Sequence, residues 1–319
     1  METQAYNYFD IYNNLDFAKI IDHPNILIAA NFWDEDRFIA AKTCYKFMRK
    51  IDDLIDNYKS EHSIIAENEK ELFIAEVNQW IDSLKYNSSD GPFQDDLVET
   101  FNRFRIPLWT MEAFAKSMIY DIHYTGFSSM NKFLGYCSGA SIAPASVFVH
   151  LCGITKNKDG FSAPQYNVKR IATPCAIFSY LVHIIRDFQK DQTSNLNYFA
   201  DDMIIKHGLN HHELHEMAIS GIINNRFRSM IKEYYLLANQ YRLKTYKMIR
   251  EITPFLEPRY QLSLEIIFNL YLMVYERINI QEGNFTRDEL NPTAKEISER
   301  VYQTICMFNE VEKKHFLTA

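Results

Sequence analysis

The sequence of 319 residues contains little glycine and little proline, with nine of each. Sheets need many tight turns, and tight turns are built largely from these two residues. Their scarcity therefore argues against a β-sandwich or a β-barrel. Neither a GxGxxG nor a GxxxxGKS pattern occurs, which argues against a Rossmann or Walker type of phosphate loop.

Positive charge is also scarce, with 34 Lys and Arg against 41 Asp and Glu and a net charge of −7. Nucleic acid is therefore not an expected partner, because it needs a broad basic face. The five cysteines form no CxxC pair, so we interpret them as reduced thiols of a cytosolic protein. The N-terminal segment lacks the basic and apolar regions of a signal peptide.

Long apolar runs are missing too, and none approaches the roughly 20 residues that span a bilayer. We therefore expect a cytoplasmic protein, one that can still contact a membrane surface peripherally. Apolar residues make up 47% of the chain and include 23 Phe and 20 Tyr, enough for a large core.

Apolar residues recur with helical spacing along nearly the whole chain. We expect helices at 34–57, 68–86, 108–124, 131–153, 170–191, 226–252, 261–279 and 294–309. Loops rich in Asn, Asp, Gly, Ser or Pro are expected at 87–93, 155–165, 191–199 and 282–292. The prediction is one all-α domain, residues 1–319, with about ten helices or more.

The segment YKFMRKIDDLIDNY (45–58) places Asp52 and Asp56 four residues apart. On a helix they share one face, where two like charges weaken the helix by a few tenths of a kcal/mol. Taken alone, the pair is explained by a solvated helix face, with Arg49, Lys50 and Lys59 as partners.

A second pair, Asp187 and Asp191, lies in SYLVHIIRDFQKDQ (179–192), with His183 four residues earlier. The preceding turns are apolar, so this helix is expected to be buried, where charges are costly unless paired or bound to metal. Arg186 is an available partner. Together, the two acidic pairs suggest facing walls of one cavity. Carboxylates suit Mg²⁺ and a diphosphate, and aromatic rings suit the carbocation that remains when diphosphate departs.

The chain resembles the squalene/phytoene synthases from about residue 20 to residue 280. YKFMRKIDDLID is similar to the family's first aspartate-rich motif, and IIRDFQKD resembles the second, usually written NxxxDxxED. The segment YCSGASIAPASVFVHLCG (136–153) resembles the family's apolar pocket helix. LNYFADDMI (196–204) is similar to its RIYLPxDDL segment. Asp121 stands sixteen residues before Cys137, as an aspartate does in the family.

The resemblance implies the all-α isoprenoid-synthase (class I terpenoid synthase) bundle around a central cavity, with two or three Mg²⁺ ions. It implies that the metal ligands are Asp52, Asp56, Asp187 and Asp191. His183 joins them as a candidate catalytic residue. The residues expected to bind substrate are His23, Tyr45, Arg49, Tyr136, Tyr180, Arg186, Lys190 and Tyr271.

The implied activity joins two prenyl diphosphates, farnesyl or geranylgeranyl, head to head. One allylic diphosphate ionises, the alkene of the second attacks it, and proton loss closes a cyclopropyl diphosphate. The use of NADPH and the oligomeric state stay open, since squalene synthases carry no Rossmann fingerprint.

Several positions depart from the family pattern: His183 replaces Asn, Tyr180 replaces Gln, Lys190 replaces Glu, and SIAPA replaces AGTVG at 141–145. A neutral His can ligate a metal, and a protonated one can donate to phosphate. Two alternatives therefore stay open. One is a member that cyclises a single prenyl group or transfers it to a non-prenyl acceptor. The other is a non-catalytic assembly protein, against which the four aspartates argue.

A further histidine-rich segment, HGLNHHELHEM (207–217), contains His211 and His215 about one helical turn apart. This spacing suits a transition metal, but the solvated start of a helix explains it more simply.

Overall fold

The computed structural model describes residues 7–20, 25–61, 65–88, 91–123, 126–158, 160–194 and 196–318, with only the backbone at 19–20, 60–61 and 311–318. The chain is 78% helical and has almost no strands. This confirms the expected all-α fold class. His23, expected at the substrate site, lies outside the described residues.

The elements of the first half are α1 (Tyr8–Asn13), α2 (Phe17–Ile20), α3 (Asn25–Ala30), α4 (Glu35–Glu61), α5 (Glu67–Tyr86), α6 (Pro92–Phe104), α7 (Trp109–His123), α8 (Met130–Cys137), the π-helix η1 (Ser138–Ile142) and α9 (Ala143–Gly153). Those of the second half are β1 (Thr155–Asn157), β2 (Gly160–Ser162), α10 (Val168–Arg186), α11 (Phe188–Thr193), α12 (Asp201–Lys206), α13 (His211–Ser220), α14 (Asn225–Ile252), the 3₁₀ helix η2 (Thr253–Phe255), α15 (Pro258–Arg277), α16 (Arg287–Leu290) and α17 (Ala294–Thr318).

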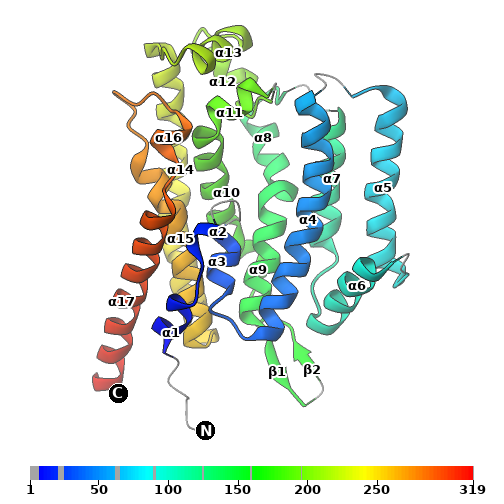
Figure 1. Cartoon of the computed structure of the whole chain (residues 1–319), viewed down its shortest axis with the longest axis vertical. Coiled ribbons are helices and arrows are strands. Elements are labelled where there is room, and N and C mark those ends of the chain that lie inside the picture. Colours follow the sequence, from blue (N-terminus) through cyan, green and yellow to red (C-terminus); the bar gives the residue numbers. More distant parts are fainter. Residues whose placement is uncertain are drawn as a thin grey trace.

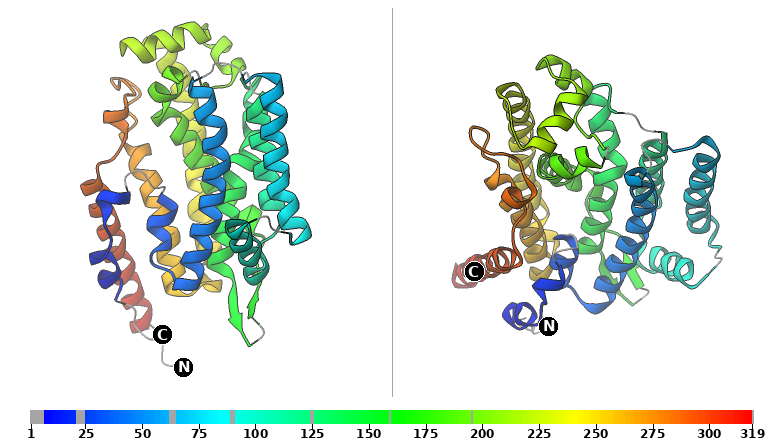
Figure 2. Two further views of the ribbon diagram at one scale, coloured as in Figure 1. Left: turned by 45° about the vertical axis from the view of Figure 1, so that its right-hand side comes forward. Right: turned by 45° about the horizontal axis from the view of Figure 1, so that its top comes forward.

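The long helices run side by side along the vertical axis of Figure 1. Helix α10 is the central one, since it packs against α8, η1, α9, α14 and α15. The short helices α11, α12 and α13 lie together at the upper end of the bundle, and the hairpin β1–β2 lies at the lower end. Viewed with its top forward, the bundle shows these short helices grouped at the upper end (Figure 2, right).

Most expected helix boundaries agree with the structure to within a few residues, as usual for helix ends. Helix α6 was not expected, and α17 extends to Thr318 rather than 309. The expected loop 155–165 contains an antiparallel hairpin, in which Thr155 pairs with Ser162. The expected helix start in the histidine-rich segment is present, because Asn210 and Glu213 form a capping box at the first turn of α13.

The expected single helix at 170–191 is interrupted, because Asp187 has non-helical dihedral angles and separates α10 from α11. The hydrogen-bond pattern nevertheless continues through the break. The Asp187 amide donates to the His183 carbonyl at 2.8 Å, and the Asp191 amide donates to the Asp187 carbonyl at 2.8 Å. His183, Asp187 and Asp191 therefore remain on one face, about one turn apart.

The π-helix η1 lies between α8 and α9 and packs closely against α7. At Gly139 a Cβ atom would collide with the backbone carbonyl of Ala113, so only glycine permits this approach. On the same side, Ser117 donates a hydrogen bond to the carbonyl of Tyr136 at 3.0 Å. These contacts fix Tyr136 beside the upper end of α7, as π-bulges often do near functional sites.

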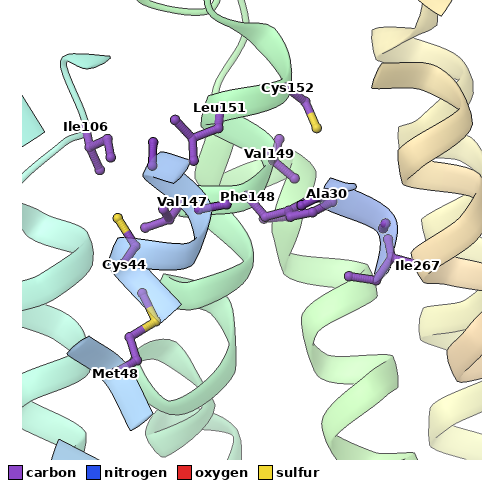
Figure 3. Packing of buried hydrophobic residues seen from close by; sticks show 14 of the residues in the cluster. Ala30, Cys44, Met48, Ile106, Val147, Phe148, Val149, Leu151, Cys152 and Ile267 are labelled. Carbon is purple, nitrogen blue, oxygen red and sulfur yellow. The ribbon is translucent and has the colours of Figure 1, made fainter. Parts of the chain in front are cut away.

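The core consists of two clusters of buried side chains, one that includes α4 and α9 and one around the upper parts of α10 and α14. Figure 3 shows the first, with Cys44 and Met48 of α4 beside Val147 of α9. Burying an apolar side chain of this size contributes about 1.5–3 kcal/mol. All five cysteines are free thiols, which agrees with their interpretation as reduced residues.

Two helical stretches, Met130–Gly153 and Val168–Arg186, are long and apolar enough to cross a membrane by length and composition. The expectation that no apolar run approaches this length is therefore wrong. In each stretch 61% of the most apolar window is buried inside the bundle. Buried core helices pass the same test, so these stretches are weak evidence for a membrane span.

Candidate functional site

The first wall of the candidate site is the upper half of α4. Asp52 and Asp56 share one face of this helix and are partly buried. Arg49 Nη1 contacts Asp52 Oδ2 at 2.7 Å, and Arg49 Nη2 pairs with Asp53 on the next face. Arg49 is the most exposed member of this group, with 45% of its side chain accessible. It therefore stands at the rim, where a ligand can compete for it.

The second wall is the junction of α10 and α11. Both oxygens of Asp187 accept hydrogen bonds from Arg186, at 2.8 Å from Nε and 2.6 Å from Nη2. Burial acts to raise the pKa of Asp187, but the hydrogen bonds and charge of Arg186 outweigh it and lower the pKa. Asp187 is thus ionised and already paired with Arg186, the partner that was available in the sequence.

The two walls face each other, because charges on one act on carboxyls of the other. The positive charge of Lys190, on α11, acts on both Asp52 and Asp56 of α4. The negative charge of Asp56 acts in turn on Asp191. Such effects weaken with distance, so Lys190 and Asp191 of α11 lie near the two carboxyls of α4.

Asp56 and Asp191, one from each wall, have too little positive charge around them to stay fully ionised at neutral pH. Burial raises the pKa of Asp56 to about 7, and the charge of Asp52 adds to the shift. Burial, together with the charges of Asp187 and Asp56, raises the pKa of Asp191 to about 8. Perturbed carboxyls of this kind are typical of functional sites, where a cation or ligand supplies the missing charge.

A further buried carboxyl, Asp121 at the end of α7, extends the acidic group. It is 6% exposed, and burial raises its pKa to about 8 although Tyr136 donates a hydrogen bond to it at 2.5 Å. The charges of Asp56 and Asp52 also act on it. Asp121 matches a family aspartate by its spacing from Cys137, but the sequence predicted no role for it. Its place as an acidic residue among apolar turns of α7 was the available signal.

Lys59 also points into the site rather than to solvent. Its ammonium donates to the backbone carbonyl of Asp121, and it interacts electrostatically with Asp121 and Asp56. Burial lowers the pKa of Lys59, although the two negative charges act to raise it. From the sequence, Lys59 was expected only as a partner of Asp52 and Asp56 on a solvated helix face. Its proximity to α7 is a tertiary feature that the sequence does not show.

Aromatic side chains gather beside Asp121 and Asp56. The rings of Tyr136 and Tyr180 lie 6.1 Å apart, and Tyr180 meets Tyr198 edge to face at 6.3 Å. Phe127 lies 5.0 Å from the Tyr136 ring. Burial raises the pKa of Tyr198, and the charge of Asp56 adds to it, so this tyrosine, which the sequence analysis missed, belongs to the same site.

The remaining expected residues gather beside the second wall. The ring of Tyr271, on α15, meets the His183 imidazole edge to face at 5.2 Å. Arg186 and Tyr45 both influence the pKa of the Tyr271 hydroxyl, which places Tyr45 of α4 nearby. Burial, with the charge of Arg186, lowers the pKa of His183 to about 3, so its imidazole is neutral.

The donor set fits a divalent cation with oxygen ligands, since carboxyls with raised pKa values come from two facing walls. Nowhere in the described ranges do three His, Cys, Asp or Glu side chains already lie close enough together to hold a metal ion. On the second wall the reason is visible, because Arg186 occupies both oxygens of Asp187.

Two open hollows of about 550 and 660 Å³ lie elsewhere on the molecule. The first is lined by residues such as Lys50, Trp80 and Phe93, and the second by residues such as Trp109, Tyr166 and Lys169. None of the aspartates lines either one, so neither hollow belongs to the candidate site.

The helical bundle is that of the all-α terpenoid synthases. The family model of the squalene/phytoene synthases matches residues 24–296 of the chain. The chain therefore belongs to the squalene/phytoene synthase family, which confirms the resemblance. Members of this family bind prenyl diphosphates and use a divalent metal.

The individual relatives are distant. A chloroplastic phytoene synthase from an Oncidium hybrid cultivar is 20% identical over 254 residues, 79% of this chain, and the chain spans 58% of that protein's length. A dehydrosqualene synthase solved in complex with a ligand has a TM-score of 0.71 at 14% identity, covering 95% of this chain and 99% of that one. Squalene synthase HpnC from Alicyclobacillus acidocaldarius has a TM-score of 0.63 at 10% identity, covering 89% and 94%. At these identities the structures demonstrate the shared fold.

Proposed function

We propose that this protein, acting as one domain over residues 1–319, ionises allylic prenyl diphosphates with Mg²⁺ and condenses two of them head to head. The observation that supports this most directly is the pair of facing acidic walls with too little positive charge. A site of this charge is poorly suited to a diphosphate alone and well suited to a diphosphate with its divalent ions.

The residues of the two walls divide the work. Asp52 and Asp56 on α4, with Asp187 and Asp191 on the other wall, would hold the metal. Bound there, a divalent ion neutralises the charge that develops on a departing diphosphate. Three positive side chains, Arg49, Arg186 and Lys190, stand among these carboxylates and would bind diphosphate oxygens directly.

The rings beside these carboxyls would receive the prenyl cation. Tyr136, Tyr180 and Tyr198 form a mostly buried group, and Tyr136 is hydrogen-bonded to Asp121. Ring faces stabilise positive charge, and the exclusion of water prevents its premature capture. Proton loss closes the cyclopropane ring. Asp121 and its partner Tyr136 are the buried groups nearest to this region that can accept or relay a proton.

Release of diphosphate from prenyl substrates tests the proposal. The purified protein should release diphosphate from farnesyl or geranylgeranyl diphosphate with Mg²⁺, and mass spectrometry should detect a C30 or C40 product. Reactions with and without NADPH separate a cyclopropyl diphosphate or dehydrogenated product from a reduced one. Folded protein that releases no diphosphate from any allylic substrate of C10 to C20 would contradict the proposal.

A further inference from the structure

His183 has a buried nitrogen atom with no partner. Among the described residues its Nε2 is one of four buried side-chain polar atoms that make no hydrogen bond. A buried polar atom without a hydrogen bond costs free energy and therefore needs an explanation. Ligation of an ion is one such explanation. His150 also has such an atom, Nδ1, but its other ring nitrogen lies 2.9 Å from the Phe104 carbonyl oxygen, away from the aspartates.

The backbone places His183 in line with the acidic second wall. Its carbonyl accepts the Asp187 amide and the Asp187 carbonyl accepts the Asp191 amide, so the three side chains follow one another up a single face. The spacing of four residues places the His183 ring beside Asp187 on this face. Two oxygen donors and one nitrogen donor are therefore presented on successive turns.

The neighbours of His183 hold the ring without satisfying it. The edge of Tyr271 packs against the imidazole at an interplanar angle of 63°, while the Tyr271 hydroxyl is engaged by Ser179. The Arg186 guanidinium is turned toward Asp187. The imidazole is thus oriented by packing and has no hydrogen-bond partner for Nε2.

We propose that His183 Nε2 ligates the metal ion held by Asp187 and Asp191, and that this nitrogen makes the site prefer Co²⁺ to Mg²⁺. The inference rests on the proposed function, because it takes a metal at the acidic walls as given. Mg²⁺ is a hard ion that prefers oxygen ligands, whereas imidazole favours later first-row metals. One nitrogen in an otherwise oxygen-based site therefore changes selectivity without removing the site.

The metal must displace Arg186 from Asp187 to reach these ligands. Arg186 is 22% exposed and Asp187 is 26% exposed in this pair, so both remain accessible at the rim. An arriving diphosphate offers Arg186 a new anionic partner and so frees the carboxylate. We therefore expect the nitrogen ligation to be strongest when metal and diphosphate are present together.

Pulsed EPR of bound Mn²⁺ is the direct test, on protein with ¹⁵N-labelled histidine, with and without inorganic diphosphate. We expect ¹⁵N coupling in the wild type and none in His183→Asn, which offers an oxygen ligand in place of the nitrogen. His150→Asn is the matched control, since it removes another buried histidine with an unpartnered atom and should leave the coupling intact. If His183→Asn does not fold, His183→Gln serves the same purpose.

The outcomes separate this inference from the proposed function. Mn²⁺ bound without histidine coupling overturns the nitrogen ligand and leaves the metal site standing. Folded wild-type protein that binds no Mn²⁺, with or without diphosphate, overturns the metal site and the inference with it. In calorimetric titrations, His183→Asn should lower the ratio of Co²⁺ to Mg²⁺ affinity about tenfold. An unchanged ratio would also overturn the nitrogen ligand.

Discussion

The two ends of the bundle each bury charged side chains. The lower end balances them, whereas the upper end leaves several carboxyls with too little positive charge. At the lower end, where α4 starts, Asp34 accepts hydrogen bonds at 2.6 Å from both Arg37 and Tyr260. Arg37 also donates to the carbonyl of Ile154 at 2.6 Å. Burial acts to raise the pKa of Asp34, but these hydrogen bonds outweigh it and lower the pKa.

At the upper end the same helix, α4, carries buried carboxyls whose pKa values are raised, as are those of its neighbours Asp121 and Asp191. The difference separates two uses of buried charge. A network in which each charge meets its partner ties elements together, whereas a group of like charges with too few partners is a site for a ligand.

The largest expected effect lies at the upper end. Asp56→Asn or Asp187→Asn should lower the rate of diphosphate release by about 1,000-fold, because each removes a charge that holds the metal. Steady-state assays of diphosphate release measure this. Asp53→Asn is the matched control, since Asp53 lies on the next face of α4 and pairs with Arg49. Near-normal rates in the Asp56 and Asp187 variants would show that the metal assignment is wrong.

The lower end should respond in stability instead. Arg37→Met leaves Asp34 partly buried without its charged partner and should cost about 3 kcal/mol of the free energy of unfolding. Urea denaturation measures this cost. The release rate per folded molecule should stay the same. A large loss of activity with unchanged stability would break the distinction between the two ends.

A smaller effect should appear in the pH dependence of metal-free stability. Asp56 and Asp191 have folded pKa values of about 7 and 8, above the unfolded value of 3.8. The folded state therefore binds their protons more tightly. This stabilisation is fully present below pH 3.8 and is lost progressively as the pH rises from there through 7 to 8. Asp34 has the opposite sign, since its lowered pKa gives stability that is lost only as the pH falls below about 4.

Melting temperatures between pH 5 and pH 9 test this. The metal-free protein should lose stability toward pH 9, and Mg²⁺ should restore more of it as the pH rises, because metal binds the ionised carboxylates. Asp191→Asn should flatten the metal-free profile. An equally steep profile in that variant would show that Asp191 is not the titrating group.

Much of the fold was predictable because helical periodicity and the lack of turn residues are local properties. Helices α4, α5, α7, α14 and α15 were expected within a few residues of their observed bounds. The acidic pairs were also visible, since a spacing of four residues places side chains on one helix face. The hairpin at 155–162 and the break at Asp187 were not expected, because short strands and helix ends depend on tertiary contacts more than on pattern.

The sequence by itself determined an all-α chain of the squalene/phytoene synthase family and the two acidic motifs. Only the tertiary structure decided how positive and negative charges are distributed around the two acidic motifs. It brought Asp121 and Lys59 to the walls, paired Arg186 with Asp187, and left a nitrogen of His183 without a partner. The physical reason is that helix spacing fixes the face on which a side chain lies. Burial and charge balance depend on residues that are distant in the sequence.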